Sequence, residues 1–492
     1  MHLLATQQTL LADGAEAVDL CQSPADIIII SAADTELTLL AHTYTKYCNN
    51  LPTLRLANAL HLSHNMSVDL YTEKIVKKAK LVIVRLLGGR NYWPYGVDEI
   101  SRTCQNNKIL CAFLPGDDQP DPELSAYSSL PTQKTHKLWQ YSIHGGPSNA
   151  ENFLKYAGTL IGYKNNWLEP QPLLKTGLYW PKTEICTIEE IKQNWVSKNP
   201  LAAIVFYRAL VQSGMTEGVD ALIKGLIKVG LNPLPIFAQS LKDPLTGASV
   251  DKLILDNQPD IILSAVGFAV SSAGIPWKPG PLDSANTPIL QVGFASSSKD
   301  DWAKGFQGLS SRDITMNVAL TEIDGRVFTR AVSFKSHENF NQHAEFKTIT
   351  HKPLLNRINF VSKLAANWVK LRNLPNQEKK IAVIFANYPN KDARLGNGVG
   401  LDTPASALTV LKALKTAKYK TGKLPKNANE IIKLLKAGPT NNFKDLKTRT
   451  IKSTLPINTY KKWFGCLPKG ARSSICTKWG LPEDDPYFLK EG

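Results

Sequence analysis

The chain has 492 residues, of which 43% are hydrophobic and 20% are charged, so it is an ordinary globular sequence long enough for two to four domains. No apolar run approaches the roughly eighteen residues of a membrane-spanning helix, and the first residues lack the basic start of a secretory signal. The seven cysteines are scattered without a C-x-x-C pair or a zinc spacing, which indicates reduced thiols in a cytoplasmic protein.

The net charge of +16 is concentrated near the C-terminal end of the sequence. The stretch Thr403–Gly492 holds 18 Lys and Arg against 6 Asp and Glu, a net charge of +12. Such a stretch is either a contact for a polyanionic ligand or a solvated lysine surface. Nucleic acid is the less favoured partner, because aromatic residues interleave with lysines only in KKWFG at Lys461–Gly465.

The first part of the chain alternates short apolar runs with amphipathic stretches, which predicts an α/β domain over residues 1–145 with a parallel sheet between helices. The expected strands are HLLAT (2–6), IIIIS (27–31), LVIVRLL (81–87) and ILCAFLP (109–115), and the expected helices are TELTLLAHTYTKY (35–47), MSVDLYTEKIVKKA (66–79) and VDEISRTCQNN (97–107).

A helical and Pro-rich connector is expected over 146–200, and the alternation restarts in a second α/β domain over 201–374. Two alternating runs around Asp324-Gly325 predict a type I′ hairpin. The expected strands are LAAIVFY (201–207), NPLPIFAQS (232–240), DIILSAVGF (260–268) and TPILQVGF (287–294), and the expected helices are EGVDALIKGLIKVG (217–230) and RINFVSKLAANWVKLRNL (357–374).

Residues 375–492 read as the start of a third α/β unit that is truncated. IAVIFANYPN (381–390) predicts a strand ending in a loop, and SALTVLKALKTAKY (406–419) predicts a helix capped by Thr403 or Ser406. The predicted fold class is therefore α/β, with several parallel-sheet domains in series and helical connectors.

The loop after the expected strand 81–87 has an unusual composition for a chain reversal. Its glycines allow close backbone approach, its arginines offer planar forks for carboxylates, and its rings can stack on a flat ligand. The alternative is a loop whose rings pack on a neighbouring domain. The candidate ligand-binding residues here are Arg85, Gly88, Gly89, Arg90, Tyr92, Trp93 and Tyr95.

Two further strand ends carry candidate binding residues, since ligands of α/β sheets lie beyond the carboxyl ends of the strands. Tyr207 and Arg208 follow LAAIV, where the arginine is either a ligand contact or a salt-bridge partner in a domain interface. A polar, Gly-rich loop before a helix is also typical of anion sites. In this third loop the candidates are Asn387, Tyr388, Asn390, Arg394, Asn397 and Asp402.

Nucleotide and metal signatures are weak in this chain. Gly396-x-Gly398-x-Gly400 is not a G-x-G-x-x-G motif, and no Walker A motif is present, so ATP is not expected to bind here. His61 and His64 lack a third metal ligand and are more simply surface or packing residues. Asp117-Asp118 is either a cation site or, more simply, a turn.

Taken in order, several of these stretches resemble the large subunit of aerobic cobaltochelatase (CobN type), a family related to the porphyrin-binding large subunit of magnesium chelatase. The resemblance covers residues 1–410 and, more loosely, the remainder. It rests on LPTLRLANALHLSHNMSVDLY, LLGGRNYWPYGV, LPGDDQPDPEL, AAIVFYRALVQSG, SLKDP, NVALTEIDGRVFTRAVSF and ANYPNKDARLGNGVGLDTPAS.

The resemblance implies a substrate, a metal and partners. The tetrapyrrole hydrogenobyrinic acid a,c-diamide would be bound, Co²⁺ would be the substrate metal, and AAA+ ATPase subunits would supply ATP hydrolysis for vitamin B12 (cobalamin) biosynthesis. A flat macrocycle with several carboxylates is the kind of ligand that an Arg, Gly and aromatic loop suits.

One departure concerns length. Members of this family are more than twice as long and carry a later segment of the form H-x-G-K-H-G-x-x-E-W, which this sequence does not contain. The resemblance therefore implies a fragment, a split-gene product or a truncated copy, which is expected to lack chelatase activity alone. An alternative function is that of a non-catalytic tetrapyrrole-binding or scaffold protein. No catalytic base and no metal ligand are assigned from the sequence.

Overall fold

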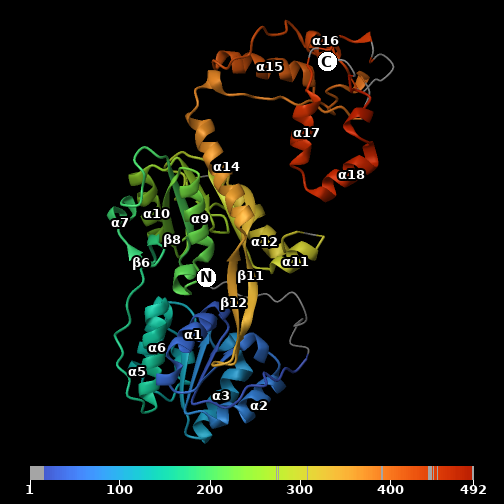
Figure 1. The fold of residues 1–492 in the computed structure, drawn as a ribbon. Coiled ribbons are helices and arrows are strands. Elements are labelled where there is room, and N and C mark those ends of the chain that lie inside the picture. Colours follow the sequence, from blue (N-terminus) through green and yellow to red (C-terminus); the bar gives the residue numbers. More distant parts are fainter. Residues whose placement is uncertain are drawn as a thin grey trace. The chain divides into compact units, whose positions relative to one another are not determined.

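The computed structural model describes residues 16–492 apart from 273, 275, 277, 307, 389–391, 441–445, 447, 452 and 490–492. The chain divides into two compact units, Met1–Lys370 and Leu371–Gly492, and the first contains both sheets of the protein (Figure 1). The strand expected at 2–6 lies outside the described residues. None of the described helices combines the length and apolar character needed to cross a membrane.

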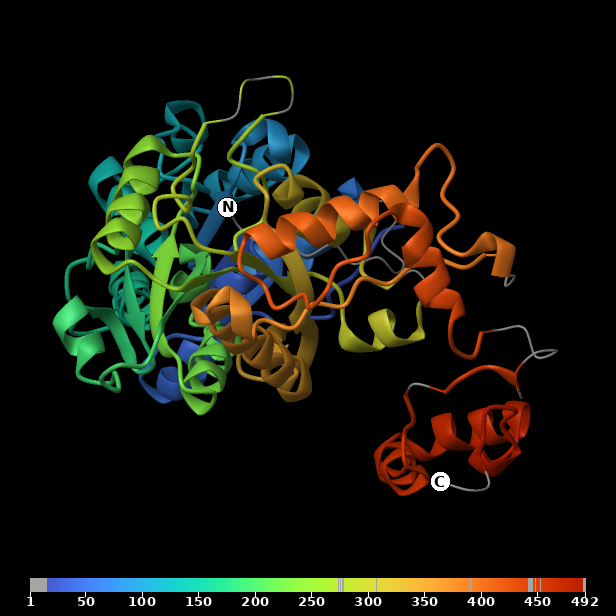
Figure 2. The same ribbon diagram turned by 90° about the horizontal axis from the view of Figure 1, so that it is seen from above.

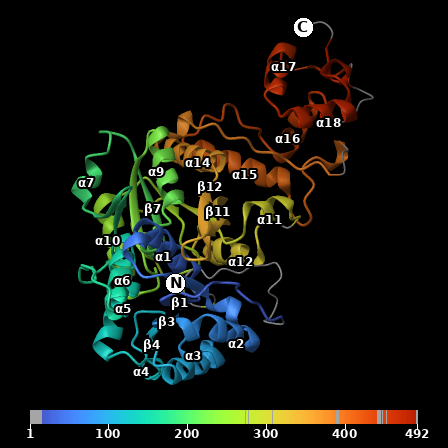
Figure 3. The ribbon, with the colours of Figure 1, turned by 60° about the horizontal axis from the view of Figure 1, so that its bottom comes forward.

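The first sheet has four parallel strands in the order β2-β1-β3-β4. Successive side chains of these buried strands point to opposite faces of the sheet and pack into two separate hydrophobic cores. One core lies against α1, α5 and α6, and the other against α2 and α3 (Figure 3). The strands are β1 (Ile27–Ser31), β2 (Leu54–Asn58), β3 (Leu81–Leu86) and β4 (Leu110–Pro115), and the helices are α1 (Asp34–Tyr47), α2 (Asn65–Lys74), α3 (Pro94–Asn106), α4 (Pro122–Ser125), α5 (Thr132–His144) and α6 (Pro147–Leu160).

The second sheet has eight strands in the order β12-β11-β10-β9-β7-β8-β5-β6, of which β7 to β11 are parallel. Helices lie on both sides of the green strands when this unit is seen from above (Figure 2). The strands are β5 (Thr176–Trp180), β6 (Thr183–Cys186), β7 (Leu201–Tyr207), β8 (Asn232–Ala238), β9 (Ile261–Ser264), β10 (Ile289–Ala295), β11 (Val327–Asn341) and β12 (Phe346–Pro353), and the main helices are α7 (Ile188–Lys192), α8 (Arg208–Gln212), α9 (Glu217–Lys228), α10 (Pro244–Asn257), α11 (Lys299–Lys304), α12 (Ser311–Ile314) and α14 (Leu355–Asn373).

The predicted fold class is confirmed, since the molecule is an α/β protein with a parallel sheet and a mostly parallel mixed sheet. The apolar runs expected as strands in the first two parts of the described chain form strands, because runs buried on both faces are the signature of parallel sheets.

The hairpin expected at Asp324-Gly325 is wrong. The run before it is a π-helix (Thr315–Ala319) followed by α13 (Leu320–Glu322), so the dipeptide joins a helix to β11. The carboxylate of Asp324 accepts hydrogen bonds from the backbone N–H groups of Val270 and Ser271 at 2.7 and 2.9 Å. This long-range anchoring outweighs the local turn preference of Asp-Gly.

The hairpin that does form joins β11 to β12 and extends from the second sheet to the first (Figure 1). Ala344 and Phe346 from it are buried in the core beside α1, α5 and α6. The ammonium group of Lys335 lies 2.8 Å from a carboxylate oxygen of Asp34, and the two side chains are only 8% and 5% exposed. The hairpin therefore completes the core of the N-terminal sheet and connects the two sheets within one unit.

The second unit contains α15 (Thr403–Thr416), α16 (Ala428–Lys436), α17 (Ile457–Gly465) and α18 (Lys469–Trp479). The strand expected over 381–386 is wrong for this chain, because those residues form no regular structure. The helix expected next is confirmed as α15, but its cap is Asp402, whose carboxylate accepts from the N–H of Ala405, and not Thr403 or Ser406.

Candidate functional site

The two sheets of the first unit share one topological feature that indicates where a ligand would bind. In each, the first of the parallel strands has the second on one side and the third on the other, so the strand order reverses between β1 and β3 and between β7 and β9. In open α/β sheets, ligands bind in the crevice beyond the carboxyl ends of the strands at this reversal. Arg85 is the penultimate residue of β3 at the first reversal, and Tyr207 is the last residue of β7 at the second.

Arg85 is a buried, positively charged side chain at the strand-order reversal of the first sheet. Its Nη1 donates to the carboxylate of Glu36 at 2.8 Å, its Nη2 to the carbonyl of Gly116 at 2.8 Å, and its Nε to the carbonyl of Pro115 at 3.2 Å. Glu36 also accepts from the hydroxyl of Ser31 at the end of β1. The side chain of Arg85 is 5% exposed and that of Glu36 is 18% exposed, so the ion pair is largely desolvated.

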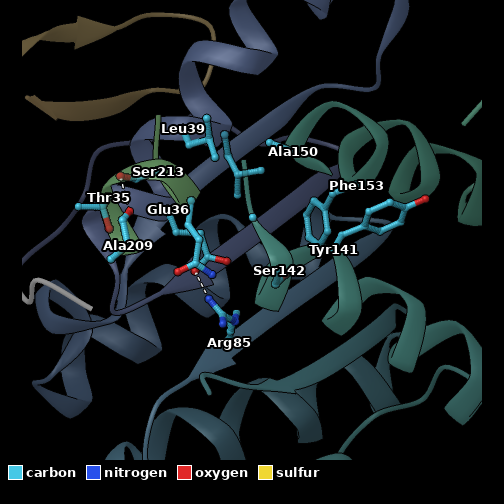
Figure 4. Close-up of a pocket in the computed structure, with 13 residues that line it drawn as sticks. Thr35, Glu36, Leu39, Arg85, Tyr141, Ser142, Ala150, Phe153, Ala209 and Ser213 are labelled. Atoms are coloured by element: carbon cyan, nitrogen blue, oxygen red, sulfur yellow. Dashed lines mark hydrogen bonds and ion pairs between the residues drawn. The ribbon is translucent and has the colours of Figure 1, made fainter. Parts of the chain in front are cut away.

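A cavity opens over this ion pair, with about 520 Å³ of empty space that includes open solvent at its mouth (Figure 4). Segments next to both sheets line its wall. The first sheet contributes Arg85 of β3, and α8, which follows β7 of the second sheet, contributes Ala209 and Gln212. The lining residues are Thr35, Glu36, Leu39, Leu40, Arg85, Tyr141, Ser142, Gly145, Ala150, Phe153, Ala209, Gln212 and Ser213.

Tyr207 and Arg208 connect the end of β7 to neighbouring segments by hydrogen bonds. The Tyr207 hydroxyl donates to the carbonyl of Gly267 beyond β9 at 3.1 Å, and burial raises the pKa of Tyr207 to about 12. Arg208 is buried and donates to the carbonyls of Leu173 and Leu174 at 2.8 Å each, with longer bonds to the carbonyl of Ile143. Burial lowers the pKa of Arg208 to about 10, which still leaves the guanidinium charged at neutral pH.

The loop after β3 depends on glycine at two consecutive positions. Gly88 and Gly89 have φ values of +94° and +66°. With ψ at −156°, Gly89 occupies a region that is essentially restricted to glycine. A Cβ at Gly89 would also lie 2.5 Å from a carboxylate oxygen of Asp121, so the loop approaches the segment after β4 closely.

The large side chains of this loop divide between the core and the surface. The indole of Trp93 is buried and its Nε1 donates to the carbonyl of Leu62 at 2.9 Å. Arg90 pairs with both carboxylate oxygens of Asp98, and this guanidinium lowers the pKa of Asp98. The rings of Tyr92 and Tyr95 are 41% and 37% exposed. The loop thus offers solvent two rings and a partly exposed arginine.

The candidates from 387–402 lie in the second unit. Asn387 bridges to Leu395, Asp402 caps α15, and Tyr388 is exposed. Arg394 ends a short 3₁₀ helix, and its carbonyl accepts from the N–H of Asn397. Asn390 lies outside the described residues. Of the predicted site residues, the structure brings Arg85 to the cavity and places Arg208 at the start of α8, one turn before Gln212 on its wall.

Several residues on the cavity wall were not predicted from the sequence, chiefly Glu36, Ser142, Gln212 and Ser213. A signal for Glu36 existed, since it lies in the first turn of the helix that follows the first strong strand. Ser142 carries no such signal, because only the packing of α5 against the sheets brings it to the cavity.

The described residues contain no group of three or more His, Cys, Asp and Glu side chains placed to hold a metal ion. His64 caps α2, its Nδ1 accepting from the N–H of Met66. Asp118 pairs with Lys175 at 3.2 Å, and Asp117 accepts from the N–H of Gln119, as in an ordinary turn.

Comparison with known proteins places these features in a family. A model of the CobN/magnesium chelatase family matches residues 139–491. Across 99% of its length the chain is 42% identical to the aerobic cobaltochelatase subunit CobN of a Sinorhizobium species and 36% identical to that of Pseudomonas aeruginosa. It spans only 39% of each of those proteins.

A solved structure gives the same result. The catalytic subunit of cobaltochelatase from Mycobacterium tuberculosis superposes with a TM-score of 0.67 at 25% identity, over 96% of this chain and 37% of that one. The match of the family model to most of the sequence and the agreement of the fold lead to one conclusion: this chain belongs to the CobN/magnesium chelatase family.

Proposed function

We propose that this chain is the N-terminal, tetrapyrrole-binding portion of a cobaltochelatase large subunit, and that a carboxylate arm of the macrocycle enters the cavity over Arg85. The observation that carries the proposal is the 42% identity to a CobN subunit across 99% of the chain. The substrate is hydrogenobyrinic acid a,c-diamide, the substrate metal is Co²⁺, and the product belongs to cobalamin biosynthesis in the cytoplasm.

The chemistry of the cavity supports an acidic ligand arm. A guanidinium carries five N–H donors, and the hydrogen bonds of Arg85 to Glu36, Pro115 and Gly116 use one each of its three nitrogens. A carboxylate arriving beside Glu36 shares the cation with it.

The exposed face of the loop after β3 supports contact with the rest of the macrocycle. Tyr92 and Tyr95 offer flat faces for stacking, and Arg90 a planar fork that is 31% exposed. The other predicted residues of the first unit, Gly88, Gly89, Trp93, Tyr207 and Arg208, are proposed to shape this binding surface. The predicted residues of 387–402 are proposed as a separate ligand contact of the second unit.

Within the complete reaction, this chain positions the tetrapyrrole. Proton removal and cobalt binding are not assigned to residues of this chain, and AAA+ partner subunits hydrolyse ATP. A second candidate function is that of a non-catalytic tetrapyrrole-binding scaffold. It is favoured by the lack of a group of three or more metal-holding side chains among the described residues.

The test is a titration of the purified chain with hydrogenobyrinic acid a,c-diamide, followed by ligand absorbance and Trp fluorescence. Arg85→Met removes the charge-assisted bonds, each of about 1.5–3 kcal/mol, and so weakens binding by about 10- to 150-fold. Arg102→Met is the control, because Arg102 pairs with Glu99 on the exposed side of α3.

The double variant Arg85→Met with Glu36→Gln keeps the cavity free of an unpaired buried carboxylate and is expected to bind as weakly as Arg85→Met. Circular dichroism checks that each variant is folded. Parent-like affinity in both Arg85 variants would remove the cavity from the proposal, and no binding by the parent chain would remove the proposal itself.

A further inference from the structure

The two charges on the wall of the cavity balance each other. Among the described lining residues, Arg85 is the one basic side chain and Glu36 the one acidic side chain, and they contact each other at 2.8 Å. The other polar side chains of the wall are uncharged. In a ligand pocket, a few such polar groups decide which chemical group of the ligand is accepted, through the protons that they can donate or accept.

Two serines on the wall present hydrogen-bond acceptors. A hydroxyl has one proton to donate and lone pairs with which to accept. The Ser142 hydroxyl donates its proton to the carbonyl of Leu138 on α5 at 3.1 Å. The Ser213 hydroxyl donates to the carbonyl of Ala209 on α8 at 2.8 Å. Because both protons are used on backbone carbonyls, these two side chains offer lone pairs to a ligand in the cavity (Figure 4).

Two further oxygens on the wall are acceptors without a donor. The Nε2 of Gln212 donates to the carbonyl of Ile143 at 2.7 Å, which assigns the orientation of the side-chain amide. None of the described residues donates to its Oε1. Glu36 has a similar oxygen, since Ser31 and Arg85 both donate to its Oε2 and none of the described residues donates to its Oε1.

The remaining side-chain donors of the wall are two N–H groups of Arg85, one N–H of Gln212 and the hydroxyl of Thr35. A carboxylate arm of a ligand can accept from these donors, but it has no proton to give to the four acceptor oxygens. A ligand that satisfies the whole wall therefore carries N–H or O–H donors in addition to a carboxylate.

A primary amide complements such acceptors, because its nitrogen carries two donors and its carbonyl one acceptor. We propose that the oxygens of Ser142, Gln212, Ser213 and the free oxygen of Glu36 form a subsite for a primary amide arm of the tetrapyrrole, beside the carboxylate arm that Arg85 binds. This inference rests on the proposed function. It makes the cavity selective for a partly amidated macrocycle over one whose arms are all carboxylates.

The selectivity follows from what a carboxylate meets in the same place. It would turn its own lone pairs toward those of the wall and bring a second negative charge beside Glu36, whose side chain is only 18% exposed. The acceptors that the amide satisfies would also be left unpaired. A closed site built to hydrogen-bond a substrate N–H rejects an analogue that lacks it by up to about 10⁵-fold. This cavity is open to solvent at its mouth, so we expect a smaller factor, of at least about tenfold.

The experiment compares two macrocycles on the purified full chain. One is hydrogenobyrinic acid a,c-diamide, and the other is hydrogenobyrinic acid, in which the two amides are carboxylates. The measured quantity is the ratio of the two dissociation constants at pH 7, from ligand absorbance and Trp fluorescence. Because the two ligands share one ring, contacts to the ring cancel in this ratio. The parent chain is expected to bind the diamide at least about tenfold more tightly.

Two variants of one residue test the subsite. Gln212→Lys keeps a donor for the carbonyl of Ile143 but replaces the free acceptor with a cation, so it is expected to bind the two macrocycles equally or to prefer the acid. Gln212→Met removes the acceptor without adding a charge and is expected to reduce the ratio by about 2- to 12-fold. Gln105→Lys is the control, because Gln105 is an exposed glutamine on α3, and it is expected to keep the ratio of the parent. Circular dichroism checks the fold of each variant.

Three results would overturn the subsite, and they separate it from the proposed function. Equal affinity of the parent for the two macrocycles, or a preference for the acid, would overturn the subsite and leave tetrapyrrole binding in place. A ratio that stays at the parent's value in both Gln212 variants would assign the selectivity to another part of the chain. No binding of either macrocycle by the parent would overturn the subsite and the proposed function together.

Discussion

The buried ion pair between Lys335 and Asp34 is expected to be the contact that holds the β11–β12 hairpin on the N-terminal sheet. The Lys335 ammonium lies 2.8 Å from one carboxylate oxygen of Asp34, and both side chains are more than nine-tenths buried. The other oxygen of Asp34 is buried without a hydrogen-bond partner among the described residues. Lys335→Met therefore leaves a buried carboxylate with no compensating charge, at a cost of about 3–5 kcal/mol.

The assay is amide hydrogen exchange of the hairpin, because local opening free energies are measured without assuming that the whole chain unfolds in one step. At about 1.4 kcal/mol per factor of ten, Lys335→Met is expected to raise exchange in the hairpin by about 10²- to 4 × 10³-fold. Lys347→Met is the control, since Lys347 is exposed on the same hairpin. Adding Asp34→Asn to Lys335→Met removes the unpaired buried charge and is expected to restore most of the protection of the hairpin amides against exchange.

The role of the ion pair is refuted if Lys335→Met exchanges no faster than Lys347→Met, or if Asp34→Asn gives no recovery. Either result would mean that the apolar contacts of Ala344 and Phe346 hold the hairpin alone.

Two further predictions concern the same unit. Burial, with the charge of Lys335 nearby, lowers the pKa of His351 from 6.5 to about 4. The unfolded chain therefore binds the extra proton first, so this histidine costs stability progressively as pH falls from about 6.5 to 4, by about 3 kcal/mol at the lower end. His351→Gln is expected to flatten that part of a stability–pH profile from urea unfolding, and an unchanged slope would contradict the assignment. Gly89→Ala is expected to cost about 1–3 kcal/mol, since it combines positive φ with a clash against Asp121. Gly230→Ala, also at positive φ but in open space, should lower the thermal midpoint less, and equal losses would show that the clash is relieved.

The sequence was most informative where structure is local. The runs that became β1, β3, β4 and β7 were predictable because strands covered on both faces are apolar along their whole length. Likewise Arg85 was predictable as a candidate because it lies at the carboxyl end of such a strand.

The sequence was least informative where a contact joins distant segments. The Asp324 carboxylate is fixed by backbone groups of Val270 and Ser271, so no local pattern could show that Asp324-Gly325 is not a hairpin turn. The pairing of Arg85 with Glu36 depends on β1 and β3 being neighbours, which is a property of strand order. The run 381–386 has strand composition but forms no regular structure, because composition alone does not supply neighbouring strands.

The position of the β11–β12 hairpin also has a consequence for biosynthesis. Asp34 and Lys335 are 301 residues apart in sequence, and the core beside α1 is complete only when Ala344 and Phe346 have joined it. At translation rates of about 5–20 residues per second, the nascent N-terminal sheet waits roughly 15–60 s on the ribosome with the part of its core that contacts Ala344 and Phe346 uncovered. During that interval it is a natural client for chaperones, and slow translation of the intervening segment lengthens its exposure to aggregation.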